Sequence, residues 1–101
     1  MYAGVVVFHV KRGKLEEAIK VWKEVLLPAA ASLPGYKGAM LLTDADVNKM
    51  MGIGLWETKK DADAWTTTGA WKWGSELRMK FEALLSEEAV REELQVEYLQ
   101  V

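Results

Sequence analysis

The chain has 101 residues, of which 50% are hydrophobic and 28% charged, and its 13 basic and 15 acidic side chains leave a net charge of −2. This length fits a single domain with one core, and the composition is that of a folded protein rather than a disordered one. A mildly acidic chain lacks the basic face that nucleic acids require. The absence of cysteine excludes disulfides and thiolate sites, and the single histidine, His9, argues against a histidine-rich metal site.

The sequence has no pattern that predicts export or membrane insertion. Met1–Val10 is apolar, but it has neither the basic region nor the cleavage site of a signal peptide. The longest stretch without charge, Val25–Tyr36, contains both prolines and is shorter than the roughly 20 residues that span a bilayer. We therefore expect a cytoplasmic protein whose partners include neither membranes nor nucleic acids.

The first predicted elements are a strand over 2–10 and a helix over 14–33. The strand is rich in β-branched residues and is apolar on both faces, which is unlike a strand with one face in water. Apolar residues of the helix recur at helical spacing, with Glu and Lys on the opposite side. Pro28 has no N–H to donate, so we expect a kink or break near 24–27. The turn 33–35 ends this element.

A hairpin follows, with strands over 36–43 and 50–57 joined by the polar loop 44–49. The second of these strands is also apolar on both faces. Its two glycines, Gly52 and Gly54, leave room for another group to approach the backbone.

The C-terminal part is predicted to hold two helical pieces and a last strand. Thr58 and Asp61 form a capping pair that opens a helix, and the threonine-rich run 66–69 is expected to break it. A second helical piece over 70–85 and a strand over 92–101 complete the order β-α-β-β-α-β. This order predicts a ferredoxin-like α+β fold, with four antiparallel strands and both helices on one face.

The second face of such a sheet would be left uncovered. Two helices cover one face only, whereas the strands 2–10 and 50–57 are apolar on both. Monomers rarely expose so large an apolar patch. We therefore predict a symmetric homodimer in which two sheets pack face to face.

Three segments carry a resemblance to a known family. Lys11–Gly13 ends the first strand before a charged amphipathic helix, and Leu33–Gly38 leads into the second strand. Leu55–Glu57 ends the third strand and is followed by 58–65, with its Asp-Ala-Asp-Ala run. With these segments, the chain resembles the antibiotic-biosynthesis-monooxygenase-like family of the dimeric α/β barrel superfamily. The resemblance covers the single domain 1–101 and implies pairing into a dimeric α/β barrel.

The resemblance also implies a ligand site. In similar proteins an aromatic ligand lies between the sheet and the helices, and a tryptophan at the position of Trp65 contributes to the pocket. Trp56 and Trp73 are further candidate ligand-binding residues, and the alternative for all three rings is that they fill the core. Arg78 could pair with an anionic group of the ligand, or with Glu82 four residues further on.

His9 is the candidate catalytic residue. It alone titrates near neutrality, which suits a general base or a donor that stabilises an anion. We predict that His9→Ala lowers turnover by roughly 10²-fold. The alternative is a histidine at a strand end that is hydrogen-bonded to backbone or water.

The resemblance implies a cofactor-independent monooxygenase acting on an aromatic, polycyclic or quinol-like molecule, in which an ionised phenol or enol reduces O2 without metal or flavin. Haem-degrading relatives use a histidine on the second helix. No histidine follows residue 9, so no haem is expected. Fold alone does not specify activity, because the family also includes isomerases and proteins of unknown role.

Two alternatives stay open. One is a non-catalytic small-molecule-binding or stress-response dimer of the same fold. The other, an isomerase or lyase, would need more polar groups. A cavity above about 300 Å³ between sheet and helices, reached by His9 and Trp65, would favour an enzyme or a binding protein. A space filled by Trp56 and Trp73 would favour a structural role.

Overall fold

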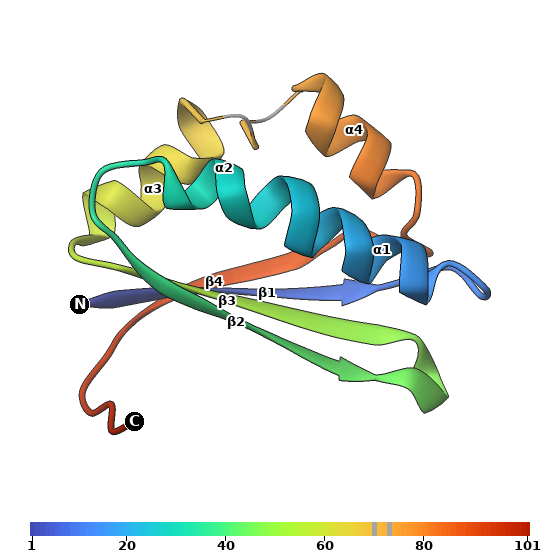
Figure 1. Cartoon of the computed structure of the whole chain (residues 1–101), viewed down its shortest axis with the longest axis horizontal. Helices are drawn as coiled ribbons and strands as arrows, with labels where there is room; N and C mark the ends of the chain where they lie inside the picture. The colour runs from blue at the N-terminus through green and yellow to red at the C-terminus, as the bar shows by residue number, and fades with distance from the viewer. Residues whose placement is uncertain (70, 73) are drawn as a thin grey trace.

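The computed structural model describes residues 1–69, 71–72 and 74–101, and within them the chain forms one antiparallel sheet with helices on one face (Figure 1). The strands are β1 Tyr2–His9, β2 Tyr36–Asp44, β3 Lys49–Trp56 and β4 Val90–Gln95, in the order β2-β3-β1-β4. The helices are α1 Leu15–Val21, α2 Leu27–Ala31, α3 Lys59–Thr67 and α4 Glu76–Glu82. The ferredoxin-like α+β architecture predicted from the sequence is confirmed.

The predicted break before Pro28 is a π-helical segment, Trp22–Leu26, that joins α1 to α2. Pro28 is the second residue of α2 and has no N–H to donate one turn back. The wider turn lets the helix pass the proline without ending. It also turns Trp22 and Leu26 toward the sheet, where both line a cavity.

Capping decides where α3 begins and ends. Thr58 Oγ1 accepts a hydrogen bond from the Asp61 amide at 3.1 Å and donates one to Asp61 Oδ2 at 2.9 Å, so the predicted capping pair is confirmed. The helix runs further than predicted, through Thr67. The hydroxyls of Thr66 and Thr67 both donate to the carbonyl of Asp63, at 3.0 and 3.1 Å, which suits helical backbone.

The second helical piece is shorter than predicted. Over 70–85, α4 occupies only Glu76–Glu82, and Ser75 caps it by accepting from the Arg78 amide at 3.2 Å. Gly74 has a φ of +78°, a left-handed conformation that a helix interior excludes. Ala70 and Trp73, the latter a predicted ligand-binding residue, lie outside the described residues.

The last strand was predicted over 92–101 and is instead β4, Val90–Gln95. It pairs with β1 from Val90 opposite Val7 to Gln95 opposite Tyr2. Tyr2 is the first residue of β1, so the residues after Val96 lie beyond the end of the partner strand. Apolar character alone does not make a strand where there is no neighbouring strand to bond.

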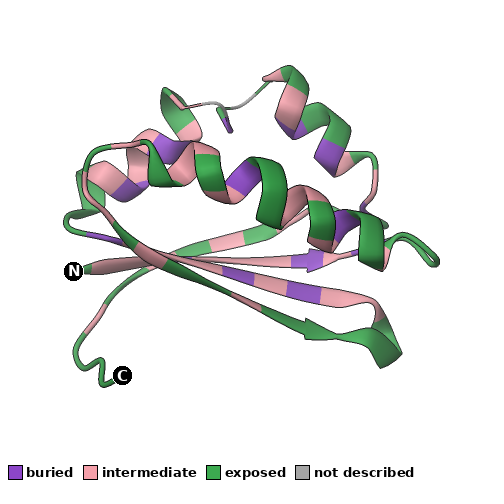
Figure 2. Ribbon diagram, in the orientation of Figure 1, coloured by how far each residue is buried: buried purple, intermediate pink, exposed green. Residues whose placement is uncertain are grey.

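The register divides the sheet into an inner face under the helices and an outer face. The inner face carries the buried residues Phe8, Met50 and Trp56, and Figure 2 shows the buried positions concentrated between sheet and helices. Among the described helices, none combines the length and apolar character needed to cross a bilayer.

The outer face is apolar on all four strands, and we call it the open face. Its apolar residues, taken from the register, are Ala3, Val5, Val7, Met40, Leu42, Met51, Ile53, Leu55, Val90 and Leu94. Met40, Leu42, Val90 and Leu94 are each at least 45% exposed. The apolar character of both sheet faces is confirmed, and no helix of the described chain covers this one.

Candidate functional site

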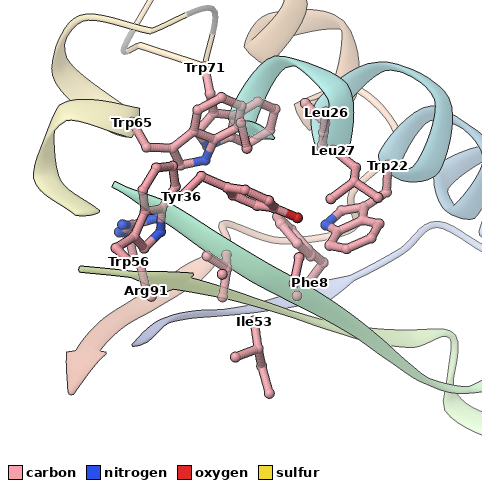
Figure 3. A pocket seen from close by; sticks show the side chains of 16 residues that line it. Phe8, Trp22, Leu26, Leu27, Tyr36, Ile53, Trp56, Trp65, Trp71 and Arg91 are labelled. Carbon is pink, nitrogen blue, oxygen red and sulfur yellow. The ribbon is translucent and has the colours of Figure 1, made fainter. Parts of the chain in front are cut away.

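A cavity of about 60 Å³ lies between the inner face of the sheet and the helices (Figure 3). Its aromatic lining residues are Phe8, Trp22, Tyr36, Trp56, Trp65 and Trp71. They come from β1, β2, β3, the π-helical segment, α3 and the turn after α3. The cavity therefore depends on the folded arrangement of nearly every element, and no short motif encodes it.

The floor of the cavity is made by three glycines of β1 and β3, namely Gly4, Gly52 and Gly54. A nitrogen-bearing side chain lies across each of them. A Cβ atom would lie 2.9 Å from Trp22 Nε1 at Gly52, 3.0 Å from Trp56 Nε1 at Gly54, and 2.9 Å from Arg91 Nη2 at Gly4. The predicted close approach to the glycines of β3 is confirmed, and the approaching groups are two indoles.

Aromatic rings continue from the sheet to α4. Trp56 lies 6.5 Å from Trp65 between ring centroids, and Trp65 lies 6.3 Å from Trp71 with the two rings 9° from parallel. Trp71 in turn meets Phe81 edge to face at 5.5 Å. Such contacts add to the free energy gained by burying the rings. These rings form a rigid apolar wall along one side of the cavity.

Among the described residues that line the cavity, Arg91 on β4 is the one with a charged side chain. Its Nη2 donates to the carbonyl of Ala62 at 3.1 Å, and its Nε lies 3.3 Å from Glu93 Oε1. A hydrogen bond with Asp63 raises the pKa of Glu93, and burial adds to the rise, although the nearby Arg91 acts in the opposite direction. The Arg91 guanidinium is thus held in place by the Glu93 carboxylate and the Ala62 carbonyl.

Replacing Asp63 with asparagine is expected to lower the pKa of Glu93, because the hydrogen bond that favours the protonated acid is lost. Because its pKa is raised on folding, Glu93 binds a proton more tightly in the folded state than in the unfolded chain, and this stabilises the fold at pH values below 4.5, the ordinary pKa of the group. The stabilisation disappears as the pH rises through the pKa of Glu93 in the folded state. Asp63→Asn should therefore flatten this part of the stability profile. NMR titration of the Glu93 carboxyl measures the effect, with Asp46→Asn as the control. An unchanged Glu93 pKa would contradict the assignment.

The structure places the predicted site residues in different surroundings. Trp56 and Trp65 both line the cavity and are 2% and 9% exposed. His9 does not line it. His9 follows the inner-facing Phe8 on β1, so its side chain belongs to the open face, where Nε2 lies 3.4 Å from Glu87 Oε1.

Arg78 also lies outside the cavity lining, although it is buried. Its Nη1 donates to the carbonyl of Trp71 at 3.2 Å, its guanidinium lies 5.2 Å from the Trp71 ring centre, and its Nε lies 3.7 Å from Glu82 Oε1. Burial lowers the pKa of Arg78, an effect that Glu82 opposes. Arg78 thus contacts both the backbone and the ring of Trp71. The alternative predicted from the sequence, that Arg78 pairs with Glu82, agrees with the observed ion pair.

Sequence reasoning did not single out Tyr36, Trp22 or Arg91. Arg91 was missed because the last strand was predicted to begin one residue after it. Alternation along β4, with Arg91 and Glu93 on the inner face, could have indicated its direction. Tyr36 lies opposite Trp56 in the register, a pairing that only the folded sheet defines.

The cavity is smaller than the 300 Å³ that would favour a preformed site. A volume of about 60 Å³ matches roughly two water molecules. A ligand with an aromatic ring therefore enters only if lining side chains move. Among the described residues, no cluster of three or more His, Cys, Asp or Glu could hold a metal ion.

A sequence profile of the antibiotic biosynthesis monooxygenase family matches residues 1–77. The chain belongs to this family. No curated protein sequence matches it significantly.

Solved structures share the fold at low sequence identity. A point mutant of SnoaB, a cofactor-independent oxygenase from Streptomyces nogalater, is 17% identical, with a TM-score of 0.79 over 97% of this chain and 94% of that one. A monooxygenase from the gene ActVA-Orf6 of Streptomyces coelicolor, in complex with nanaomycin D, is 16% identical, with a TM-score of 0.78 over 99% and 90%. A Nitrosomonas europaea protein of unknown function is 16% identical, with a TM-score of 0.71 over 99% and 92%. At these identities the likeness establishes the fold and leaves activity open.

Proposed function

We propose that this protein is a cofactor-independent monooxygenase that acts on an aromatic or quinol-like small molecule in the cavity between sheet and helices. The observation that carries the proposal is the aromatic wall, in which Trp56 lies across Gly54 of the glycine floor and Trp65 also lines the cavity. Family membership supports the reaction class, and two of the similar structures are an oxygenase and a monooxygenase, the latter with a bound ligand.

In the proposed reaction the protein excludes water and holds a flat ring. The ionised form of an electron-rich phenol or enol then transfers an electron to O2 directly, so the chemistry needs neither metal nor flavin. Trp65 and Trp56 would contact the ring faces, and Tyr36 would meet the ring edge. The apolar wall would keep the reactive intermediate away from water.

The working form that we propose is a homodimer through the open face, in the cytoplasm. The ten apolar residues of that face lie on all four strands, and the edge-strand ones are half exposed. A second copy of the same face is apolar over the same extent and therefore complementary in chemistry.

Oxygen uptake tests the proposal. With phenols and quinols as substrates and no added metal or flavin, we expect uptake with at least one compound, and its loss in Trp65→Ala. Tyr98→Ala, at an exposed ring, is the matched control. If no compound supports uptake, the oxygenase proposal fails.

His9→Ala belongs in the same experiment. Because His9 lies outside the cavity lining, we expect the variant to keep its uptake. A fall of about 10²-fold, the usual scale of general acid–base catalysis, would support the sequence-based prediction that His9 is the base.

The second candidate function is non-catalytic binding of a small molecule. The composition of the lining favours it, since His9 lies outside the cavity and no described lining side chain is a carboxylate or imidazole that could act as a general base. Ligand binding in calorimetry without oxygen uptake would support this alternative.

A further inference from the structure

One of the four described tryptophans that line the cavity is held differently from the others. Trp56, Trp65 and Trp71 are at most 9% exposed, and ring contacts with centroids 6.5 and 6.3 Å apart join them to one another. Trp22 is only partly buried, and none of the ring contacts among the described residues includes it. Trp22 can therefore move without breaking an aromatic contact, whereas the other three rings are fixed in the core.

Trp22 lies over Gly52 in the floor of the cavity. A Cβ atom on Gly52 would lie 2.9 Å from Trp22 Nε1, so the indole rests on the strand where a side chain would otherwise stand. Figure 3 shows Trp22 across the cavity from Trp56 and Trp65. An indole is itself the size of a small aromatic ligand. Its withdrawal would therefore add to the cavity of about 60 Å³ a space that a flat ring fits.

The backbone that carries Trp22 is less regular than an α-helix. Trp22 is the first residue of the π-helical segment, and its carbonyl accepts from the amide of Leu27, five residues further on. Pro28 has no N–H, so the carbonyl of Glu24 lacks the donor that an α-helix would give it. Such π-helical turns are rare and are frequent at functional sites. This turn gives the Trp22 side chain a backbone that can adjust with the loss of few hydrogen bonds.

The other described rings of the lining are held in place. Tyr36 is partly buried, as Trp22 is, but it meets Trp56 edge to face at 5.9 Å. Phe8 is 3% exposed and meets Phe81 at 5.0 Å. Among the described rings, Trp22 is therefore the one whose movement best admits a ligand.

Resting on the proposed function, we propose that Trp22 is the gate of the cavity and sets the size of the ligand that the cavity accepts. The indole swings away from Gly52 as an aromatic ligand enters, and the ligand ring takes its place on the glycine floor. The buried tryptophans of the wall keep their positions. Because the gate must open first, the apparent affinity is reduced in proportion to the fraction of molecules in which it is open. A ligand too large for the space that Trp22 vacates is excluded.

Alanine at two glycines of the floor tests the gate without any ligand. Gly52→Ala and Gly54→Ala bring the same methyl group against Trp22 and Trp56, at 2.9 and 3.0 Å from the indole nitrogens. A gate yields to the methyl group, whereas Trp56 is fixed by its neighbours. We expect Gly54→Ala to melt about 4 °C or more below Gly52→Ala in thermal unfolding. A smaller difference, or the reverse order, overturns the inference and leaves the proposed function standing.

A two-ring and a three-ring phenol, 2-naphthol and 9-phenanthrol, test the size limit in calorimetry. We expect Trp22→Ala to raise the affinity for 9-phenanthrol, relative to that for 2-naphthol, by about tenfold or more. Val25→Ala is the matched control, because Val25 is a 43% exposed residue of the same π-helical segment and does not line the cavity. This variant should keep the wild-type ratio.

An unchanged ratio in Trp22→Ala overturns the size limit and leaves the aromatic site intact. Binding of neither phenol by the wild type and both variants overturns the proposed function and, with it, this inference. If Trp22→Ala does not fold, Trp22→Leu keeps an apolar side chain without the ring, and the same change in ratio is expected.

Discussion

Replacing Trp71 with alanine is expected to lower the free energy of unfolding by about 3–5 kcal/mol, the usual cost of removing a large buried aromatic side chain. Trp71 is 4% exposed, stacks on Trp65 and meets Phe81 edge to face. The Arg78 guanidinium also lies 5.2 Å from the Trp71 ring centre. Because these neighbours come from different elements, they cannot collapse into the space together. Urea unfolding of the variant and the wild type measures the difference.

The same substitution should enlarge the cavity. Indole, added at increasing concentration, is expected to raise the melting temperature of Trp71→Ala more than that of the wild type, because it binds the folded state only. Tyr98→Ala is the matched control, since Tyr98 is 80% exposed, and its stability should change by no more than about 0.5 kcal/mol. If Trp71→Ala is too unstable to study, Trp71→Phe retains part of the packing. A loss below about 1 kcal/mol in Trp71→Ala would contradict the packing argument.

Placing a charge on the open face is expected to convert the proposed dimer into a monomer. Met40 on β2 and Leu94 on β4 are 50% and 52% exposed in the single chain, so Met40→Glu and Leu94→Glu should leave the fold of each subunit intact. In the dimer each carboxylate would be buried without a partner, at a cost of several kcal/mol per ion. Light scattering at micromolar concentration should give a dimer mass for the wild type and a monomer mass for both variants.

Val47→Glu provides the control for this experiment. Val47 is 60% exposed, a value close to the 50% of Met40 and the 52% of Leu94, but it lies in the short turn between β2 and β3. We expect this variant to stay dimeric, because a charge there remains in water. A monomeric wild type, or dimeric Met40→Glu and Leu94→Glu, would contradict pairing through the open face.

The pattern of apolar residues along the sequence predicted β1, β2 and β3 correctly. β1 and β3 have a neighbouring strand on each side, and β2 pairs with β3 in a hairpin. The strand predicted over 2–10 matches β1, and the two hairpin strands match β2 and β3 to within a residue at each end. Local chemistry also determined the Thr58 cap and the break before Pro28, because caps and proline act on their own turn of backbone.

Two boundaries were predicted wrongly, one set by the conformation of a single backbone residue and the other by strand pairing. The helix predicted over 70–85 begins only at Glu76, since the left-handed Gly74 precedes it. The strand predicted over 92–101 ends at Gln95, where β1 gives it no further partner. These boundaries depend on backbone conformation and pairing that periodicity does not record.

The sequence by itself determined the fold class and the apolar character of the open face, because both follow from the spacing of apolar residues along the strands. Trp56 and Trp65 were candidate ligand-binding residues through the family resemblance, and the structure places both in the cavity lining. Only the tertiary structure decided that His9 lies outside the cavity and that Arg91 lies on its floor. Successive side chains of a strand point to opposite faces of the sheet. Neighbouring residues such as Phe8 and His9 therefore lie on different faces, and the folded sheet decides which face meets the cavity.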